Sequence, residues 1–419
     1  MGAAVHLGRM GLGKDVVVIE RDSNYTKSSA MLSAGGIRQQ FSLKENIEMS
    51  MYSRAFMQAM DSAALEDPDR FCSVEFKPNG YLFMASTPTG RDTLQTNNRM
   101  QHACGATWVK LEEDMGRVQE LFPWLNTEEL LAVTHSRGGG EGYFDPWALV
   151  QGMKREAISL GVTVMTGEVV GASVQSAGTG TGESHVVDKL RVRMANGAEE
   201  VLETSTVFNT AGAYAGKLTD LIISSVADSS ARSSLLRIPV KPKKRCIFAV
   251  HCPGKGNFGL PAPTSSAPLT VDPSGVYFRG EGAGYGNYIC GVSPTADNDP
   301  DCEDDSALDI VDHDLFNEVV WPALAQRVPA FNELKVTASW AGFYDHNALD
   351  ENAIIGAHPQ ITNMVYCTGF SGHGIQMGPA AGRACAEILQ TGKSTSIDLS
   401  AFGLERLVTK TPIYETGIV

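Results

Sequence analysis

The sequence has 419 residues, of which 43% are hydrophobic and 20% are charged. This length predicts two or three domains, and the composition excludes disorder, collagen and coiled coil as descriptions of the whole chain. The 48 acidic residues outnumber the 34 basic ones, which gives a net charge of −14. An anionic surface repels phosphate backbones and anionic lipid, so nucleic acid is not expected as a partner.

The eight cysteines are spread singly along the chain, without a C-x-x-C pair. This spacing favours reduced thiols and predicts neither a disulfide scaffold nor a zinc site, so no metal is expected. No apolar run approaches the ~18 residues that a membrane span needs. We therefore expect no transmembrane segment.

The first 22 residues have the pattern of the second half of a βαβ unit. Residues 1–10 predict a small-residue helix, and the apolar run 16–19 predicts a strand that ends at Glu20. In dinucleotide-binding units an acid at that point accepts the ribose hydroxyls, although many parallel strands also end in an acid. No strand and no G-x-G-x-x-G turn come before the helix. We therefore expect either truncation at the N-terminus or weakened binding of the cofactor.

The middle of the chain is rich in predicted strands. Ser42 and Glu45 have capping-box spacing and predict a helix over 43–64, and the Pro78-Asn79-Gly80 turn predicts a hairpin over 71–84. Asp145 and Pro146 predict a helix start. Further predictions are strands at 162–166, 168–174, 188–194 and 201–207, a linker at 224–235, and a helix near 312–326. Helix and strand alternation at both ends predicts an α/β nucleotide domain with an antiparallel domain inserted into it.

The end of the chain predicts a strand at 363–367, a glycine-rich loop at 368–374 and a helix at 375–389. Glycines let backbone N–H groups approach a ligand, and the positive end of the following helix favours partial negative charge there. Such a loop also serves as a tight packing corner, so the loop alone does not establish a cofactor site.

Four blocks in this order resemble the D-amino-acid oxidase and sarcosine oxidase family of FAD-dependent oxidoreductases: 16–22, 28–42, 209–216 and 369–383. The resemblance implies a Rossmann-like FAD domain of the glutathione-reductase type, interleaved with an antiparallel-sheet substrate domain. It places the FAD domain in three parts, 1–66, 148–223 and 346–407. The substrate domain takes two parts, 67–147 and 236–345.

Five further blocks resemble one mitochondrial member of that family: 144–155, 241–254, 311–316, 327–331 and 340–356. This resemblance implies a mitochondrial location and a role in assembling respiratory complex I, with its subunits or assembly intermediates as partners. The alternative is a dehydrogenase of amines or N-methyl amino acids without any assembly role. Both interpretations imply FAD as cofactor. The expected small-molecule partner is an amine or amino-acid-like substrate, whereas in an assembly factor FAD would mainly stabilise a binding surface.

The resemblance also implies a set of site residues. Those at the cofactor would be Glu20, Arg21, Ser33, Gly35, Gly36, Arg38, Val170 through its backbone, Ala211, Gly212, Gly372, His373, Gly374, Ile375 and Gln376. His373 and Gln376 would also act in catalysis, together with Tyr344 near the substrate and Arg279 as a carboxylate fork. The competing interpretations are a surface salt bridge for Arg279 and a structural hydrogen bond for His373.

Three departures from the family pattern refine these expectations. Sarcosine oxidases have a lysine at the position of Gln376, where the cation promotes reaction with oxygen, so a dehydrogenase is expected here. Gly342 and Leu32 stand at the positions of flavin-linking cysteine and histidine residues, so the FAD is expected to be non-covalent. Phe41 replaces a second carboxylate-binding arginine, which argues against a small amino acid as substrate.

Overall fold

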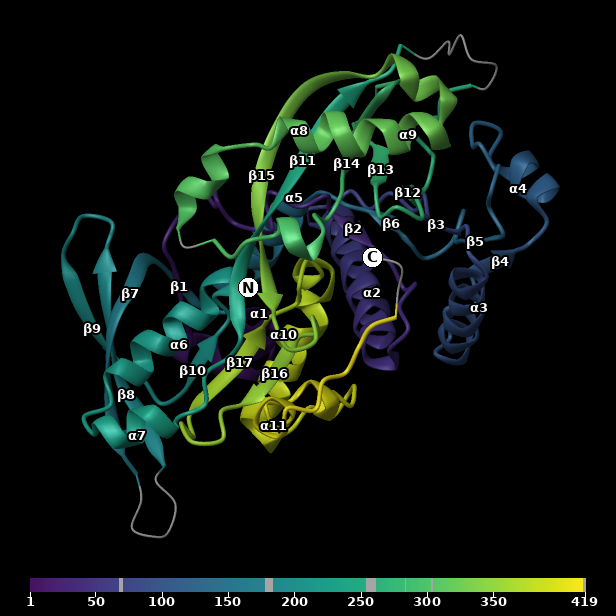
Figure 1. Ribbon diagram of the computed structural model, residues 1–419. Coiled ribbons are helices and arrows are strands. Elements are labelled where there is room, and N and C mark those ends of the chain that lie inside the picture. Colours follow the sequence, from purple (N-terminus) through teal and green to yellow (C-terminus); the bar gives the residue numbers. More distant parts are fainter. Residues whose placement is uncertain (68–70, 178–183, 254–260, 283, 303, 417–419) are drawn as a thin grey trace.

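The computed structural model describes residues 1–67, 71–177, 184–253, 261–282, 284–302 and 304–416. These residues form a mixed α/β fold with one large sheet, two smaller sheets and a two-stranded ribbon (Figure 1). The expected fold class is therefore confirmed. The domain boundaries stay predictions.

The large sheet contains strands from two separate parts of the chain. Its spatial order is β15 (Lys335–Asn347), β11 (Val240–His251), β14 (Asn287–Gly291), β13 (Tyr277–Gly280), β12 (Leu269–Val271), β3 (Tyr81–Ala85), β5 (Ala132–His135) and β4 (Lys110–Glu112). Neighbouring strands are antiparallel except β12 and β3, which are parallel. Helices α8 (His313–Leu315) and α9 (Trp321–Arg327) lie across one face of this sheet (Figure 1), and the helical segment 313–327 agrees with the expected one.

The hairpin expected over 71–84 is wrong. Strand β3 pairs with β5 and β12, and all five of its residues are buried. The backbone before it bonds elsewhere, since Lys77 N donates to Tyr143 O at 2.7 Å. A fully buried strand needs neighbours on both sides, and the segment before it supplies neither neighbour.

Two smaller sheets lie beside the large one. The first has the order β1 (Val17–Glu20), β7 (Thr163–Ser176), β8 (His185–Met194), β9 (Glu199–Glu203), and the second has the order β10 (Val207–Asn209), β17 (Met364–Thr368), β16 (Ile354–Ala357). A short ribbon joins β2 (Gly36–Ile37) to β6 (Gly142–Tyr143). Among the described residues β1 pairs only with β7, and β10 only with β17. The two strands expected at 162–174 are one continuous strand, β7.

The remaining helices are α1 (Gly2–Leu7), α2 (Lys44–Glu66), α3 (Pro88–Ala103), α4 (Met115–Leu121), α5 (Pro146–Ser159), α6 (Ala215–Ser224), α7 (Ser229–Ser234), α10 (Gly374–Thr391) and α11 (Glu405–Thr409). The expected helices at 43–64 and 375–389 are confirmed as α2 and α10, whereas α7 lies where a linker was expected. Asp145 caps α5 by accepting a hydrogen bond from Ala148 N at 3.1 Å. Within the described ranges, no helix has both the length and the apolar character required to cross a bilayer.

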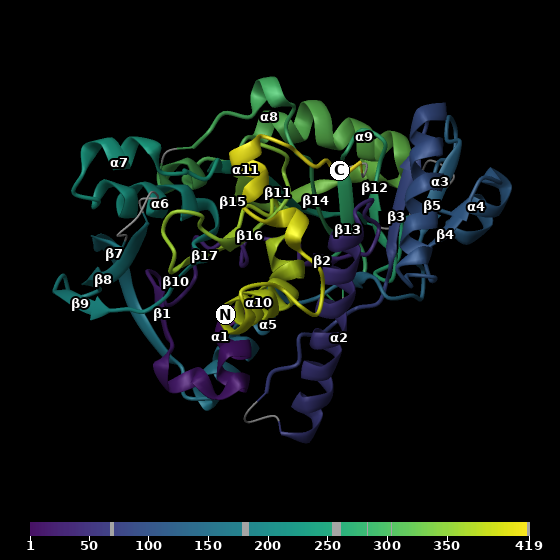
Figure 2. The ribbon, with the colours of Figure 1, turned by 90° about the horizontal axis from the view of Figure 1, so that it is seen from below.

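Helix α1 packs against α10, near the middle of the molecule (Figure 2). A Cβ added at Gly382 would lie 2.3 Å from Gly2 C, and one added at Gly2 would lie 2.4 Å from Gly378 O. Only glycine leaves room for the two backbones at this crossing.

Gly382→Ala should therefore lower the free energy of unfolding by about 1–3 kcal/mol, because the new methyl group forces α1 away from α10. Gly378→Ala is the matched control, since a Cβ there meets nothing within 4 Å. It should be neutral or stabilising by up to about 1 kcal/mol through helix propensity. Urea unfolding of the ligand-free protein measures both, and equal effects of the two variants would contradict the crossing described.

Candidate functional site

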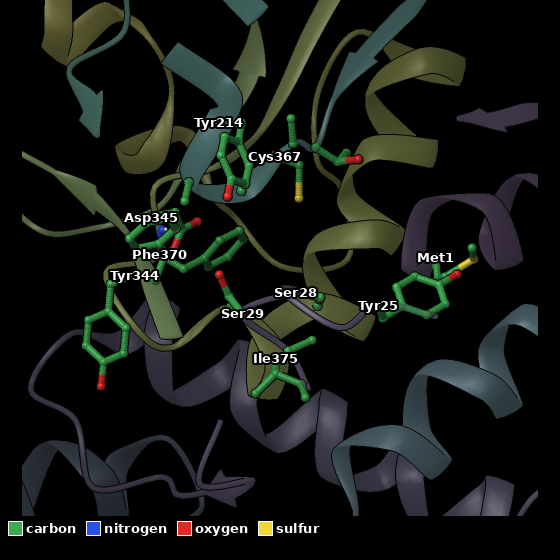
Figure 3. Close-up of a pocket in the computed structure, with 18 of the residues that line it drawn as sticks. Met1, Tyr25, Ser28, Ser29, Tyr214, Tyr344, Asp345, Cys367, Phe370 and Ile375 are labelled. Carbon is green, nitrogen blue, oxygen red and sulfur yellow. Dashed lines mark hydrogen bonds between the residues drawn. The ribbon is translucent and has the colours of Figure 1, made fainter. Parts of the chain in front are cut away.

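A cavity of about 2360 Å³ lies between the two smaller sheets and the large sheet. Figure 3 shows Tyr25, Tyr214, Tyr344 and Ile375 around this space. Residues of β1 and β10 line it from the two smaller sheets. Small-molecule pockets usually measure about 300–1,000 Å³. This cavity is large enough for a dinucleotide together with a small second molecule.

Most of the residues expected at the site line this single cavity. They are Glu20, Arg21, Ser33, Gly36, Arg38, Ala211, Gly212, Tyr344, Gly372, His373, Gly374, Ile375 and Gln376. Gly35, Val170 and Arg279 are not among the lining residues. The individual roles of all these residues stay predictions.

Arg279 does not have the surroundings expected of a carboxylate fork. Its Nε donates to Ala34 O at 2.7 Å, its Nη1 donates to Gly280 O at 2.8 Å, and it forms an ion pair with Glu281. The guanidinium also lies 4.4 Å from the centre of the Tyr143 ring. Arg279 is only 6% exposed, so it is not a surface salt bridge either. Its donors hold the turn at Ala34 in place.

Gly35 and Val170 lie just outside the cavity wall for separate reasons. Gly35 has φ +67°, and a Cβ there would lie 2.5 Å from Phe144 O, so the turn at this position requires glycine. Val170 stands where the register of β7 shifts, and its carbonyl accepts a hydrogen bond from Arg191 at 3.5 Å. Its neighbours 167–169 line the cavity instead.

A buried carboxylate holds the glycine loop before α10. Asp345 Oδ2 accepts a hydrogen bond from Phe370 N at 3.0 Å, and the Asp345 carbonyl accepts one from Ser371 N at 3.2 Å. Gly372 has φ +98°, and a Cβ there would lie 2.6 Å from the Tyr344 ring. The loop is thus fixed by Asp345 and restricted to glycine where it passes Tyr344. Sequence reasoning did not select Asp345, although its block at 340–356 was noted.

Burial raises the pKa of Asp345 to about 6, although hydrogen bonds from backbone N–H groups of the loop act in the opposite direction. Desolvation disfavours the charged carboxylate more strongly than those bonds favour it.

The first turn of α10 is joined to the 33–41 segment through Arg38. Gln376 Oε1 accepts a hydrogen bond from Arg38 N at 3.0 Å, and Arg38 Nη2 lies 3.1 Å from His373 Nε2. A guanidinium can only donate, so His373 Nε2 accepts and the imidazole is neutral. Burial, and next the Arg38 charge, lower the pKa of His373 to about 3. The Phe41 ring packs edge-on against His373 at 5.2 Å.

A second polar group lies at the Tyr344 end of the cavity. Arg245 stands 4.8 Å from the centre of the Tyr344 ring, and its Nη1 and Nη2 contact the two carboxylate oxygens of Asp299 at 2.7 and 2.9 Å. Tyr81 and Tyr277 also line this region. Burial raises the pKa of all three tyrosines, so their hydroxyls stay protonated at neutral pH.

Sequence reasoning missed Arg245, Asp299, Tyr81 and Tyr277. One pattern pointed to Arg245: Lys243 and Arg245 are two apart and therefore share one face of strand β11. Nothing in the sequence linked that strand to Asp299, which comes more than fifty residues later.

A third polar group at the cavity forms around Asp305. Arg21 Nη2 contacts Asp305 Oδ2 at 2.6 Å, Tyr214 donates its hydroxyl to the same carboxylate, and Arg21 lies 4.2 Å from the Tyr214 ring centre. Glu20 ends β1 here, and its Oε1 accepts from Asp22 N at 3.1 Å. Arg21 is therefore already paired, while Glu20 borders the open space.

The two positions for which the sequence resemblance implied flavin-linking residues lie side by side. Leu32 and Gly342 both line the cavity, and a Cβ at Gly342 would lie 2.9 Å from Leu32 Cβ. Neither residue has a nucleophilic atom. Across the described ranges, no group of three or more His, Cys, Asp or Glu is gathered in a way that holds a metal ion.

Comparisons with known proteins agree with these observations. The sequence family DAO, described as "FAD dependent oxidoreductase", matches residues 1–388. FAD-dependent oxidoreductase domain-containing protein 1 of Xenopus laevis is 41% identical over 411 residues, which cover 96% of this chain and 79% of that protein. The protein of the same name from Bos taurus is 40% identical over 400 residues, covering 93% and 78%. The crystal structure of L-proline dehydrogenase from P. horikoshii matches with a TM-score of 0.73 and 21% identity, covering 97% of this chain and 95% of that one.

The residues present fit an FAD molecule. A Cβ added at Gly212 would meet nothing within 4 Å, and the same holds for Gly378, so the backbone at both positions borders open space. Backbone N–H groups at the start of α10 are available to a partly negative group. Glu20 at the end of β1 would hold ribose hydroxyls.

The raised pKa of Asp345 predicts a pH-dependent stability. Because the folded protein binds this proton more tightly than the unfolded chain does, stability from Asp345 is fully present below pH 3.8 and is lost as pH rises through about 6. The loss is about 3 kcal/mol. Asp345→Asn should remove it, so the variant should gain stability relative to the wild type between pH 4 and 7.

Urea unfolding at a series of pH values measures this difference. The comparison between the two proteins is needed because His373, with a pKa lowered to about 3, changes stability in the opposite direction over the same pH range. A difference in stability that stays constant with pH would contradict the assignment.

Proposed function

Because the chain belongs to the FAD dependent oxidoreductase family, we propose that it oxidises a small amine or amino-acid-like substrate as a dehydrogenase rather than as an oxidase. FAD is the cofactor, and when bound it supplies the hydride acceptor. The substrate would enter the end of the cavity at Tyr344, where protonated phenols offer hydrogen-bond donors. No strong protein base is required if the amine arrives neutral.

One observation carries the choice of dehydrogenase. Two side chains at the start of α10 stand where a cation could act on the redox centre, and both are neutral. Gln376 is an amide that accepts a hydrogen bond from Arg38 N, and His373 accepts one from the Arg38 guanidinium. A positive charge near the redox centre stabilises the anion formed when oxygen takes its first electron. At 4 Å and an effective dielectric of 20 this is worth about 4 kcal/mol. Gln376 offers only a dipole, and the neighbouring Arg38 guanidinium is packed over the rings of Phe41 and Phe83.

We also propose that FAD is held without a covalent bond. Leu32 and Gly342 support this, since neither can form the bond that cysteine or histidine forms at the matching positions of relatives. Arg279 would act as a positioning residue, because it holds the carbonyl of Ala34, a residue that lines the cavity.

Stopped-flow spectroscopy of the FAD-loaded protein tests the proposal. A panel of primary, secondary and N-methyl amines is mixed with the protein without oxygen, and at least one should bleach the flavin absorbance. Oxygenated buffer should then restore the colour slowly. Gln376→Lys should speed this recovery, because it places a cation at the start of α10.

Gln376→Met is the matched control, since it also loses the acceptor for Arg38 N but adds no charge. It should leave the recovery slow. Rapid recovery of the wild type, or equal recovery of the lysine and methionine variants, would refute the dehydrogenase assignment.

The protein is further proposed to act in mitochondria, in the assembly of respiratory complex I. The sequence blocks at 144–155, 241–254, 311–316, 327–331 and 340–356 support this role through their resemblance to a mitochondrial family member. The alternative is an amine dehydrogenase with no assembly role.

Deletion of the gene should then reduce assembled complex I in mitochondria of the source organism, as measured by native gel electrophoresis. The wild type should restore it. Tyr344→Phe separates the two activities, because it removes one hydroxyl from the cavity and leaves the protein surface unchanged. It should lower amine oxidation and still restore complex I in the deletion strain. Normal complex I in the deletion strain would exclude the assembly role and leave the alternative.

A further inference from the structure

The Arg245 guanidinium, which lies 4.8 Å from the centre of the Tyr344 ring, is paired with a carboxylate. Arg245 and Asp299 side chains are only 12% and 11% exposed, and their contact joins both terminal nitrogens to both carboxylate oxygens. Such a bidentate ion pair between largely buried groups is strong and has a defined geometry. Arg245 Nε is buried and has no hydrogen-bond partner among the residues described.

Asp299 reaches this place from a segment that borders the cavity at two points. Asp299 pairs with Arg245 beside Tyr344, and Asp305 of the same segment lies beside Tyr214, where it contacts Arg21. Between them, Asp301 contacts Lys241 and Lys243 at 2.5 and 3.1 Å and does not line the cavity. The segment therefore delivers one acid to Arg245 and another to the neighbouring lysines.

The cations of β11 at the Tyr344 end thus face acids. Arg245 is paired with Asp299, whereas Lys241 and Lys243 share Asp301, and the Asp299 carboxylate also lies 4.0 Å from Lys243 Nζ. A carboxylate entering beside Tyr344 would meet Asp299 at close range and would find both terminal nitrogens of Arg245 occupied. A neutral or amine-bearing group meets no such repulsion.

We propose that Asp299 is a specificity-determining residue, which neutralises Arg245 and so excludes ligands that present a carboxylate to the Tyr344 end of the cavity. This inference rests on the proposed function for the existence of a small substrate at that end. It narrows the substrate class to molecules whose group at this end is neutral or an amine. It also identifies Arg245, rather than Arg279, as the cation that would attract a ligand carboxylate if its paired acid were removed.

Ligand-detected NMR titration of the FAD-loaded protein tests this with propionate and propionamide, which have nearly the same shape and differ in charge. The wild type should bind propionate no more tightly than propionamide. Asp299→Asn should bind propionate at least about tenfold more tightly, because Arg245 is left without its counter-ion, while propionamide binding should not change.

Asp297→Asn is the matched control, because it makes the same change at an exposed residue of the same segment, whereas Asp299 pairs with Arg245 and Asp301 with Lys243. It should leave both affinities unchanged. The double variant Asp299→Asn with Arg245→Gln should lose the gain for propionate. An equal gain in Asp297→Asn, no gain in Asp299→Asn, or a gain that survives in the double variant would overturn the proposal.

A wild type that prefers propionate to propionamide would also overturn it, whether or not the variants fold. These titrations involve no turnover. A protein that shows the expected preferences yet is bleached by no amine would therefore contradict the proposed function and not the role of Asp299.

Discussion

The arrangement of the site depends on one hydrogen bond, which Phe370 N–H donates to the Asp345 carboxylate. It joins the end of β15, in the large sheet, to the loop that links β17 to α10. Without it, the backbone donors of this loop would be left unpaired in a buried position, at a cost of about 1–3 kcal/mol each. This hydrogen bond fixes the position of α10 relative to the large sheet. It also places Tyr344, next to Asp345, against Gly372.

Arg38 connects a third part of the chain to the start of α10. Its backbone N–H binds Gln376, and its guanidinium lies over Phe41 at 4.6 Å and over Phe83 at 5.2 Å while contacting His373. Aromatic faces attract a cation, so the positive charge is stabilised without a titrating imidazole. The neutral state of His373 is therefore a consequence of where Arg38 is packed, and it does not vary over the physiological pH range.

The sequence predicted those parts of the site that depend on local pattern. The strand ending at Glu20, the glycine loop and the start of α10 were all placed correctly, because turn glycines and apolar runs act within a few residues. For Arg279 the sequence predicted a contact with a ligand, whereas in the structure its Nε donates to the Ala34 carbonyl, since a strand pattern does not tell which carbonyl a long side chain will reach. Arg245 with Asp299 could not be found from spacing, because that pair forms between segments far apart in the chain. The hairpin at 71–84 failed for the same reason: the partners of β3 are distant strands.

The size and position of the cavity connect cofactor supply to the lifetime of the protein. The space separates buried apolar clusters that in a solid core would touch, so the empty protein has less apolar contact than its length allows. A ligand that fills the space and binds only the folded form adds stability in proportion to the logarithm of its concentration over its dissociation constant. Proteases degrade the unfolded fraction, so a shortage of flavin would shorten the half-life of this chain even before any redox reaction slows.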